Sequence, residues 1–402
     1  MSSILVFLER KPFGGAERAT SLILQLLANE GYNLTVVTGE KNPASRLKNI
    51  RWVYSPLLDV PSKLHLWLTL LRPRLNQFDE LIKKSDAVYI PRLAYPVIPL
   101  AKKYGKKVVV HLHDYQPMAY CAAVYPTCEQ KYKSDVLSDM KVSLRRELLE
   151  NENTSRAFLS LLATPLNKLC GLWLSEADEL ICVSKKQRKI IGPAMPEVVK
   201  KLRVIYNPLP AQPLVEKDLS KQPSMLFLGR DSYLKGFNTF LNASYELLTR
   251  NYSVKFQLTQ NFKSARNKAI IEMLNKRFKG AYSLLGHLRY EDVLRLHSTS
   301  HALLFPSVWE EPLPYAVVES MCAGTILIAS RVGGVPEIVE GSFAEKMLFE
   351  PYNVDECIDR LELLLALSNE QVVDIGFNLR NVALKKFNSE DTGKKLTEVF
   401  SC

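Results

Sequence analysis

Short apolar runs that end in turns alternate with longer amphipathic stretches along the whole chain. In the first half, the runs expected to form buried strands cover residues 4–8, 34–38, 86–91, 107–111, 177–184 and 203–206. In the second half they cover residues 225–229, 254–258, 282–285, 301–306 and 326–330. Helical patterns lie between most of these runs. Strands that alternate with helices in this way are typical of an α/β fold with parallel sheets.

The two halves open alike, with a strand, a glycine-bearing loop and a helix. Between them, residues 207–223 hold four prolines and no aromatic residue, and they show no periodicity, which is typical of a linker. The pattern therefore predicts two Rossmann-like domains, residues 1–205 and 206–385. We expect the last helix, within residues 386–402, to cross back onto the first domain.

Composition limits the partners of the chain. The 402 residues suit two domains, and a hydrophobic fraction of 47% supports real cores. The 53 basic and 42 acidic residues give a net charge of +11, which suits a nucleotide diphosphate, an acidic membrane face or nucleic acid. Solvated lysine faces explain the same charge. Because the charge is scattered and lacks interleaved aromatic residues, no nucleic-acid partner is expected.

Cysteine usage and apolar segments bear on location. Seven cysteines without a CxxC pair indicate neither a zinc site nor a disulfide framework, and a Cys121–Cys128 bridge is not expected in a reducing cytoplasm. The apolar run at the start is too short for a signal peptide, and no apolar stretch is expected to span a membrane. We therefore expect a cytoplasmic protein, at most peripheral at the membrane. The apolar segment 157–174 favours a helix pair packed on the core over a surface resting on a membrane or an apolar acceptor.

The stretch WEEPLPYAVVES at residues 309–320 carries two carboxylates, Glu311 and Glu319, eight residues apart. If Pro314 takes the first helical position, Glu311 lies in the preceding loop and Glu319 in the second turn. The N–H groups of Tyr315 and Ala316 would then point out of the helix start, where phosphate binds well. The two carboxylates could hold sugar hydroxyls on either side of that phosphate. A surface loop before a helix with a solvated glutamate fits the motif equally.

Further candidate groups follow other strands. Arg230 and Lys235 could clamp a diphosphate, the first through its planar fork and the second as a point charge. His111, His113 and Asp114 come at the carboxyl end of a strand, the edge at which open α/β sheets bind ligands. Two histidines and an aspartate there favour function over a structural role, and no third ligand cluster supports a metal.

In this order and spacing, the motifs resemble those of family-4 glycosyltransferases, the retaining GT-B group that uses activated sugars, over nearly the whole chain. The matching motifs are GGAER at 14–18, His113-Asp114, the strand 177–184 ending in serine, Asn207, Gly229-Arg230, Lys235-Gly236, Gly286, Pro306-Ser307 and the pair Glu311 and Glu319. The resemblance implies two Rossmann-like domains facing a central cleft, with the acceptor bound by the first domain and the nucleotide-sugar donor by the second.

The resemblance also implies roles for single residues. The implied catalytic set is His113, Arg230, Lys235 and Glu311; the donor-binding set is Gly15, Gly229, Arg230, Lys235, Gly286, His287, Leu313, Tyr315, Ala316 and Glu319; the acceptor side is Gly14, Gly15, His111 and Asp114. Many members carry glycines after the first glutamate, whereas this chain has Pro312 and Pro314. Two backbone donors are lost there, so other amides must hold the phosphate.

The implied reaction moves a sugar, with retention, from a nucleotide-diphosphate donor to a hydroxyl of a glycan, a lipid or a small molecule. Neither a cofactor nor a metal is expected, because basic side chains can stabilise the leaving diphosphate and no Asp-x-Asp triplet lies in a plausible site. One alternative is a sugar-nucleotide epimerase of the same fold, which would need several catalytic acids in the first half. The other is a non-catalytic nucleotide-sugar-binding protein.

Overall fold

The computed structural model describes residues 2–9, 14–41, 47, 49–71, 77–126, 135–151, 154–209, 215–219 and 221–401. The chain forms two compact units. The first comprises Met1–Val124, Glu129–Pro210 and Phe387–Cys402, and the second comprises Tyr125–Cys128 and Ala211–Lys386. The main division thus falls at 210/211 rather than at the predicted 205/206, and the C-terminal segment belongs to the first unit. Cys128 lies outside the described residues, and Cys121 is a free, buried thiol.

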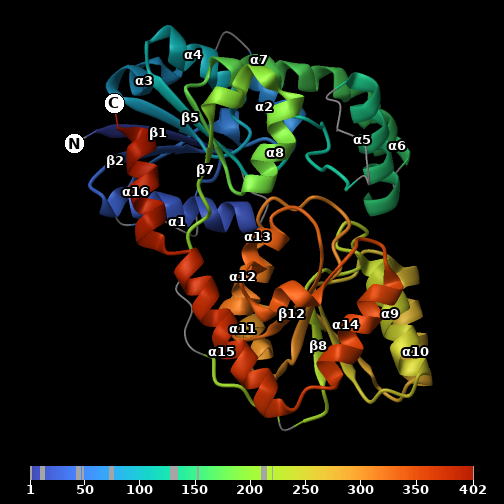
Figure 1. Cartoon of the computed structure of the whole chain (residues 1–402). Helices are drawn as coiled ribbons and strands as arrows, with labels where there is room; N and C mark the ends of the chain where they lie inside the picture. Colours follow the sequence, from blue (N-terminus) through green and yellow to red (C-terminus); the bar gives the residue numbers. More distant parts are fainter. Residues whose placement is uncertain are drawn as a thin grey trace. The chain divides into compact units, whose positions relative to one another are not determined.

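A parallel sheet forms the centre of the first unit, in the strand order β3-β2-β1-β4-β5-β6-β7. The strands are β1 (Ser3–Leu8), β2 (Asn33–Thr38), β3 (Arg51–Tyr54), β4 (Ala87–Ile90), β5 (Lys107–Leu112), β6 (Glu179–Cys182) and β7 (Leu202–Val204). Helices flank the sheet (Figure 1). They are α1 (Gly15–Asn29), α2 (Lys63–Leu70), α3 (Asp79–Lys84), α4 (Ile98–Lys103), α5 (Val136–Asn151), α6 (Thr154–Ala163), α7 (Lys168–Glu176), α8 (Lys185–Ala194) and α16 (Ser389–Phe400), with 3-10 helices at Pro56–Leu58, Tyr95–Val97, Thr164–Asn167 and Pro196–Lys201.

The second unit holds another parallel sheet, in the order β10-β9-β8-β11-β12-β13. Its strands are β8 (Ser224–Phe227), β9 (Lys255–Thr259), β10 (Tyr282–Gly286), β11 (Ala302–Phe305), β12 (Ile326–Ser330) and β13 (Leu348–Phe349). Its helices are α9 (Phe237–Thr249), α10 (Ala265–Arg277), α11 (Tyr290–Thr299), α12 (Tyr315–Cys322), α13 (Val335–Val339), α14 (Val354–Leu365) and α15 (Asn369–Lys386), with a 3-10 helix at Phe343–Met347. Two parallel sheets with flanking helices confirm the predicted α/β class of two Rossmann-like domains.

The last helix, α16, is part of the core of the first unit. It packs against α1, and its residues Leu396, Val399 and Phe400 join the apolar cluster formed by the inner strands. The ring of Phe400 meets the ring of Tyr89 on β4 edge to face at 5.4 Å. The chain therefore returns to its first unit after completing the second, as we expected for this helix.

Two local expectations are wrong. Pro314 is the residue before α12 rather than its first residue, because its ψ of 116° is extended while its carbonyl already accepts the N–H of Val317 at 3.1 Å. Within the described residues, the helical stretch Thr154–Glu176 has 23 residues, and its most apolar window of 18 residues has a mean hydropathy of 1.3, so it is long and apolar enough to cross a membrane. Length and composition alone therefore do not exclude a span, contrary to our expectation.

Candidate active site

An ion pair between an exposed lysine and a buried carboxylate joins two sequence-predicted residues in the second unit. Nζ of Lys235 lies 2.7 Å from Oε1 of Glu311, and the hydroxyl of Ser307 donates to the same oxygen at 2.9 Å. The Glu311 side chain is 6% exposed, whereas that of Lys235 is 38% exposed. Lys235 can therefore hold Glu311 and still present N–H donors to a ligand at the surface. The cation and the carboxylate predicted to serve the donor thus lie side by side.

The loop after β8 depends on unusual backbone geometry. Gly236 has a left-handed φ of +73°, and a Cβ there would lie 1.7 Å from the carbonyl oxygen of Pro306. Arg230 also has a positive φ, +46°, which is uncommon for a residue with a side chain. A Cβ on Gly229 would meet Cβ of Lys235 at 2.8 Å. The glycines therefore let this loop pack against the loop after β11, and this packing places Lys235 beside Glu311.

Glu310, a residue that we did not predict, fixes the loop that carries Glu311. It is 7% exposed, and its Oε2 accepts the backbone N–H of Gly333 at 2.5 Å. The carbonyl of Glu311 accepts the N–H of Gly334 at 2.8 Å. A Cβ on Gly333 would lie 1.8 Å from that carbonyl oxygen. Because Gly333 and Gly334 follow β12, these contacts join the loops after two neighbouring strands.

The remaining predicted donor residues lie along the carboxyl edge of the same sheet. Leu313 and Tyr315 are 8% exposed and Glu319 is 9% exposed, so the start of α12 is well packed. Ala316 follows Tyr315 in the first turn, where backbone N–H groups favour an anion. The carbonyl of Gly286 (φ +67°), at the end of β10, accepts the N–H of Gln260 at 2.5 Å, and His287 Nδ1 shares a hydrogen bond with the Gln260 side chain at 3.0 Å.

In the first unit, a second polar group lies where β1, β4 and β5 end. Glu9 follows β1, and its Oε1 lies 3.2 Å from Nε of Arg92, which follows β4. Burial raises the pKa of Glu9, and the Arg92 charge opposes that shift. Burial likewise raises the pKa of Asp114, whose Oδ1 accepts the N–H of Gln116 at 2.8 Å. We did not predict Glu9 or Arg92, although polar residues directly after two adjacent parallel strands were a usable signal.

His113 and His111 stack on one face of β5, with ring centroids 4.3 Å apart. His111 is 1% exposed and shares a 2.9 Å hydrogen bond with the hydroxyl of Tyr89, so it lies behind His113. Burial lowers the pKa of His111 to about 3, and burial together with His111 and Arg92 holds the pKa of His113 well below its ordinary value. No described residue hydrogen-bonds the buried Nε2 of His113. Both rings are thus neutral, and Nε2 of His111 likewise has no hydrogen-bond partner among the described residues. Because its Nδ1 is held by Tyr89, His111 supports the ring of His113 from behind.

Side-chain amides hold the chain on either side of His113. Gln187 donates to the carbonyls of Leu112 at 3.0 Å and Asp114 at 3.1 Å. Beyond Asp114, the Gln116 side chain accepts from the partly buried Lys63 at 2.8 Å and donates to Asn167 at 2.6 Å. Burial lowers the pKa of Lys63 to about 8. These contacts fix the segment after β5, and sequence spacing did not reveal them.

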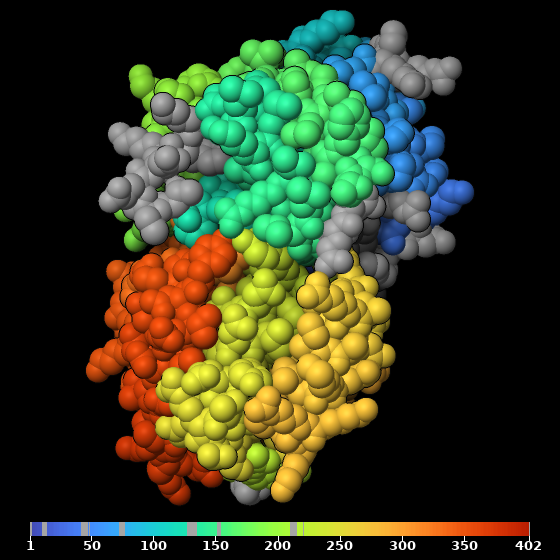
Figure 2. Space-filling view, turned by 90° about the vertical axis from the view of Figure 1, so that its right-hand side faces the viewer, coloured from blue at the N-terminus to red at the C-terminus, as the bar shows by residue number. Residues whose placement is uncertain are grey.

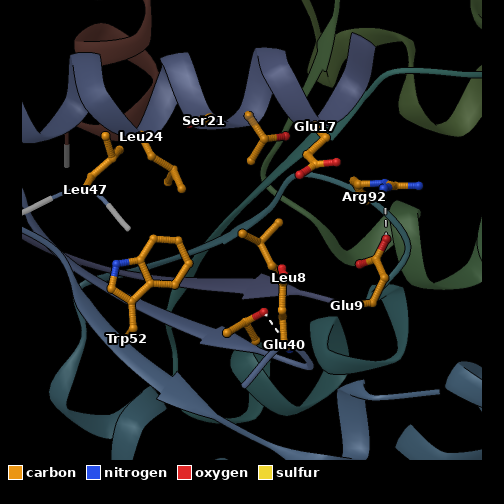
Figure 3. Close-up of a pocket in the computed structure, with 11 residues that line it drawn as sticks. Leu8, Glu9, Glu17, Ser21, Leu24, Glu40, Leu47, Trp52 and Arg92 are labelled. Carbon is orange, nitrogen blue, oxygen red and sulfur yellow. Dashed lines mark hydrogen bonds and ion pairs between the residues drawn. The ribbon is translucent and has the colours of Figure 1, made fainter. Parts of the chain in front are cut away.

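A pocket in the first unit starts at Glu9. Figure 3 shows Glu9 and Arg92 at one end, Trp52 of β3 at the other, and Ser21 and Leu24 of α1 along one side. Its empty volume is about 540 Å³, part of it open to solvent. Gly14 and Gly15 begin α1, and a Cβ on Gly14 would meet nothing within 4 Å.

The described residues contain no group of three or more His, Cys, Asp or Glu side chains that could hold a metal ion.

Comparison with solved structures defines the class of protein. Anabaena HepE in complex with UDP-glucose aligns with a TM-score of 0.70 and 17% identity over 99% of both chains. Sucrose-phosphate synthase from Thermosynechococcus elongatus aligns with a TM-score of 0.69 and 16% identity over 100% of this chain and 98% of the other. The fold is that of the GT-B glycosyltransferases.

Family models then identify the chain. The model described as Glycosyltransferase Family 4 matches residues 13–212, and the model described as Glycosyl transferases group 1 matches residues 214–381. The chain belongs to this glycosyltransferase family. A Klebsiella pneumoniae protein known as an uncharacterized 42.6 kDa protein in the cps region is 24% identical over 84% of this chain and 87% of its own length. The lipopolysaccharide 1,2-N-acetylglucosaminetransferase of Salmonella typhimurium is 23% identical over 43% of this chain and 47% of its own.

Proposed function

We propose that the protein is a retaining glycosyltransferase that needs no metal and moves a sugar from a nucleotide diphosphate to a hydroxyl acceptor. The observation that carries this proposal is the Lys235–Glu311 pair, in which a cation and a nearly buried carboxylate meet at the carboxyl edge of one sheet. A diphosphate needs the cation, and sugar hydroxyls need the carboxylate. HepE, of the same fold, was solved with UDP-glucose, so UDP-sugars are the first donors to test.

The second unit can stabilise the leaving group. As the bond between C1 and the phosphate oxygen breaks, its electron pair passes to the diphosphate, whose charge grows. Lys235 and Arg230 follow β8, and the N–H groups of the first turn of α12 follow β11, the strand next to β8. Cations and helix-start amides there would stabilise this charge in place of a divalent ion. Glu311 would accept hydrogen bonds from the donor sugar, and Glu319 from the ribose.

The acceptor hydroxyl would attack C1 of the donor sugar on the same face from which the diphosphate departs. A bond forms between the acceptor oxygen and C1, and the acceptor proton passes to the leaving phosphate oxygen. No carboxylate nucleophile is required for this route. His113, held neutral by its surroundings, would use its unpaired Nε2 for a hydrogen bond near the reacting carbon. A neutral ring suits this role because it adds no charge that would oppose an oxocarbenium-like centre.

The pocket between Glu9 and Trp52 would bind part of the acceptor. Its lining combines aliphatic side chains and an indole with carboxylates and hydroxyls, which suits the apolar face and the hydroxyl edge of a sugar ring. The carboxylates Glu9, Glu17 and Glu40 outnumber the single guanidinium of Arg92 in that lining. A neutral acceptor sugar therefore fits this pocket better than an anionic one.

The test is a screen of nucleotide sugars in EDTA, read out as released nucleoside diphosphate. We expect one donor to release its diphosphate, with the Lys235→Ala and Glu311→Gln proteins strongly impaired. An epimerase would instead convert the donor sugar and leave the diphosphate ester intact. A non-catalytic protein would bind a donor and release nothing. A reaction that stops in EDTA and returns with a divalent ion would refute metal independence.

A further inference from the structure

Large apolar side chains are exposed on three consecutive helices of the first unit, α5, α6 and α7. The most exposed are Leu137 at 70%, Phe158 and Leu159 at 62%, Leu162 at 64% and Leu172 at 63%. Figure 2 shows α5 and α6, coloured turquoise to green, on the face of this unit that is turned to the viewer. We call this set of five residues the apolar face. Single exposed leucines are ordinary, but several large apolar side chains exposed on consecutive helices, of which α5 packs on α6, indicate an interaction surface.

Helix α6 turns its small residues toward the core and its large apolar residues toward the surface, the reverse of an ordinary surface helix. Its small residues Ala157, Ser160 and Ala163 are buried, while its large apolar residues point outward. A helix that serves only the core turns its large apolar side chains inward. The inverted orientation therefore indicates that the outer side of α6 contacts something apolar.

The apolar stretch cannot span a membrane in the folded protein. Residues Thr154–Glu176 are long and apolar enough, but a 3-10 turn at Thr164–Asn167 divides them. In α7, Cys170 and Leu174 are fully buried in the unit and Trp173 is 6% exposed. Only the outward side is available, so the stretch can lie on a bilayer but cannot cross it.

Charge distribution favours an anionic bilayer as the occupant. Counted along the sequence, the first unit has 33 Lys and Arg against 22 Asp and Glu, a net charge of +11, whereas the second has 20 against 20. The whole basic excess therefore lies in the unit that carries the apolar face. On α5, the exposed Lys141 and Arg145 follow Leu137 at spacings of four residues, which places all three on one stripe of the helix.

We propose that the apolar face docks the protein on a lipid bilayer that carries anionic headgroups. Phe158, Leu159 and Leu162 insert among the acyl chains, and Lys141 and Arg145 contact the headgroup phosphates. This contact is independent of the sugar-transfer reaction, since none of these residues belongs to the candidate active site.

The test is sedimentation of the full chain with vesicles of phosphatidylcholine, alone or with a quarter phosphatidylglycerol. We expect binding to the anionic vesicles that weakens with salt. The triple variant Phe158→Ser, Leu159→Ser and Leu162→Ser should lose at least tenfold in affinity, because each side chain no longer buries apolar surface. Lys141→Ala should lose about fivefold. The matched control is Phe377→Ser in the second unit, whose side chain is also 62% exposed and whose loss should leave binding unchanged.

Three outcomes would overturn the proposal. The first is no binding to either vesicle at low salt. The second is equal binding by the triple variant, which would place the contact elsewhere. The third is a dimer in solution that the triple variant dissociates, which would make a second copy the occupant. Release of nucleoside diphosphate by the same variants, measured without vesicles, separates loss of docking from loss of activity.

Discussion

Removing the Lys235 amine tests the proposed donor site at the ion pair between Lys235 and Glu311. Lys235→Ala takes away a cation 2.7 Å from a carboxylate that is 6% exposed. Hydrogen bonds to charged groups contribute about 1.5–3 kcal/mol. Because the Lys235 side chain is 38% exposed, solvent screening lowers this to about 1–2 kcal/mol of lost stability. Turnover should fall about a hundredfold, as for loss of one donor that stabilises transition-state charge.

The pair should also show coupling. In Lys235→Ala, the Glu311 carboxylate keeps the hydrogen bond from Ser307 but loses its cation, so it repels the diphosphate. Adding Glu311→Gln removes that charge, so the double variant should recover most of the lost stability. If the two single losses were independent, they would multiply. The turnover of the double variant should be about ten times higher than that product predicts, which corresponds to a coupling of about 1.4 kcal/mol. Calorimetry and diphosphate release measure the two effects, with Lys221→Ala, at an exposed lysine of the same unit, as control. Strictly multiplicative losses, or near-normal turnover in Lys235→Ala, would refute this reasoning.

Three further results are expected. His113→Ala should lower turnover far more than nucleotide affinity, and calorimetry that shows lost nucleotide binding would move His113 to the donor site. Gly236→Ala should lower the free energy of unfolding by about 3 kcal/mol or more, because it adds backbone strain at φ +73° to a clash with Pro306. The control Gly341→Ala has the same kind of strain, at φ +81°, but open space around it, and should lower it by about 1 kcal/mol. Equal losses in the two variants would refute the packing argument. Burial lowers the pKa of His297 to about 3, whereas its value in the unfolded state is about 6.5. As the pH drops below 6.5, the unfolded state therefore binds this proton first, and the free energy of unfolding falls by up to about 1.4 kcal/mol per pH unit. An NMR signal of a protonated His297 ring at pH 5 would contradict this.

The sequence predicted those features that hydrophobic periodicity and strand ends determine. Most of the strands, the glycine loops and the positions of Lys235, Glu311 and His113 after strand ends followed from it, whereas the short edge strands β3 and β13 were not predicted. Glu310 escaped prediction because its partner, Gly333, belongs to the loop after another strand, and spacing does not show which loops meet. Gln187 escaped for the same reason, since its contacts are with backbone carbonyls after β5.

Helix orientation was the other limit. Periodicity shows that the two sides of residues 157–163 differ, but not which side faces the core. We therefore expected the large apolar residues to pack inward, whereas Ala157, Ser160 and Ala163 do so. Similarly, proline at 314 fits either the first helical position or the one before it, and only the backbone angles separate the two.

The anomeric configuration of the first product tests the proposed reaction most directly. With the donor found in the screen, proton NMR can follow the anomeric signal while nucleoside diphosphate is released in EDTA. We predict that the transferred sugar first appears with the configuration that it had in the donor, and that Lys235→Ala slows its appearance together with diphosphate release. A first product of opposite configuration, or a sugar that changes without diphosphate release, would contradict the proposed function.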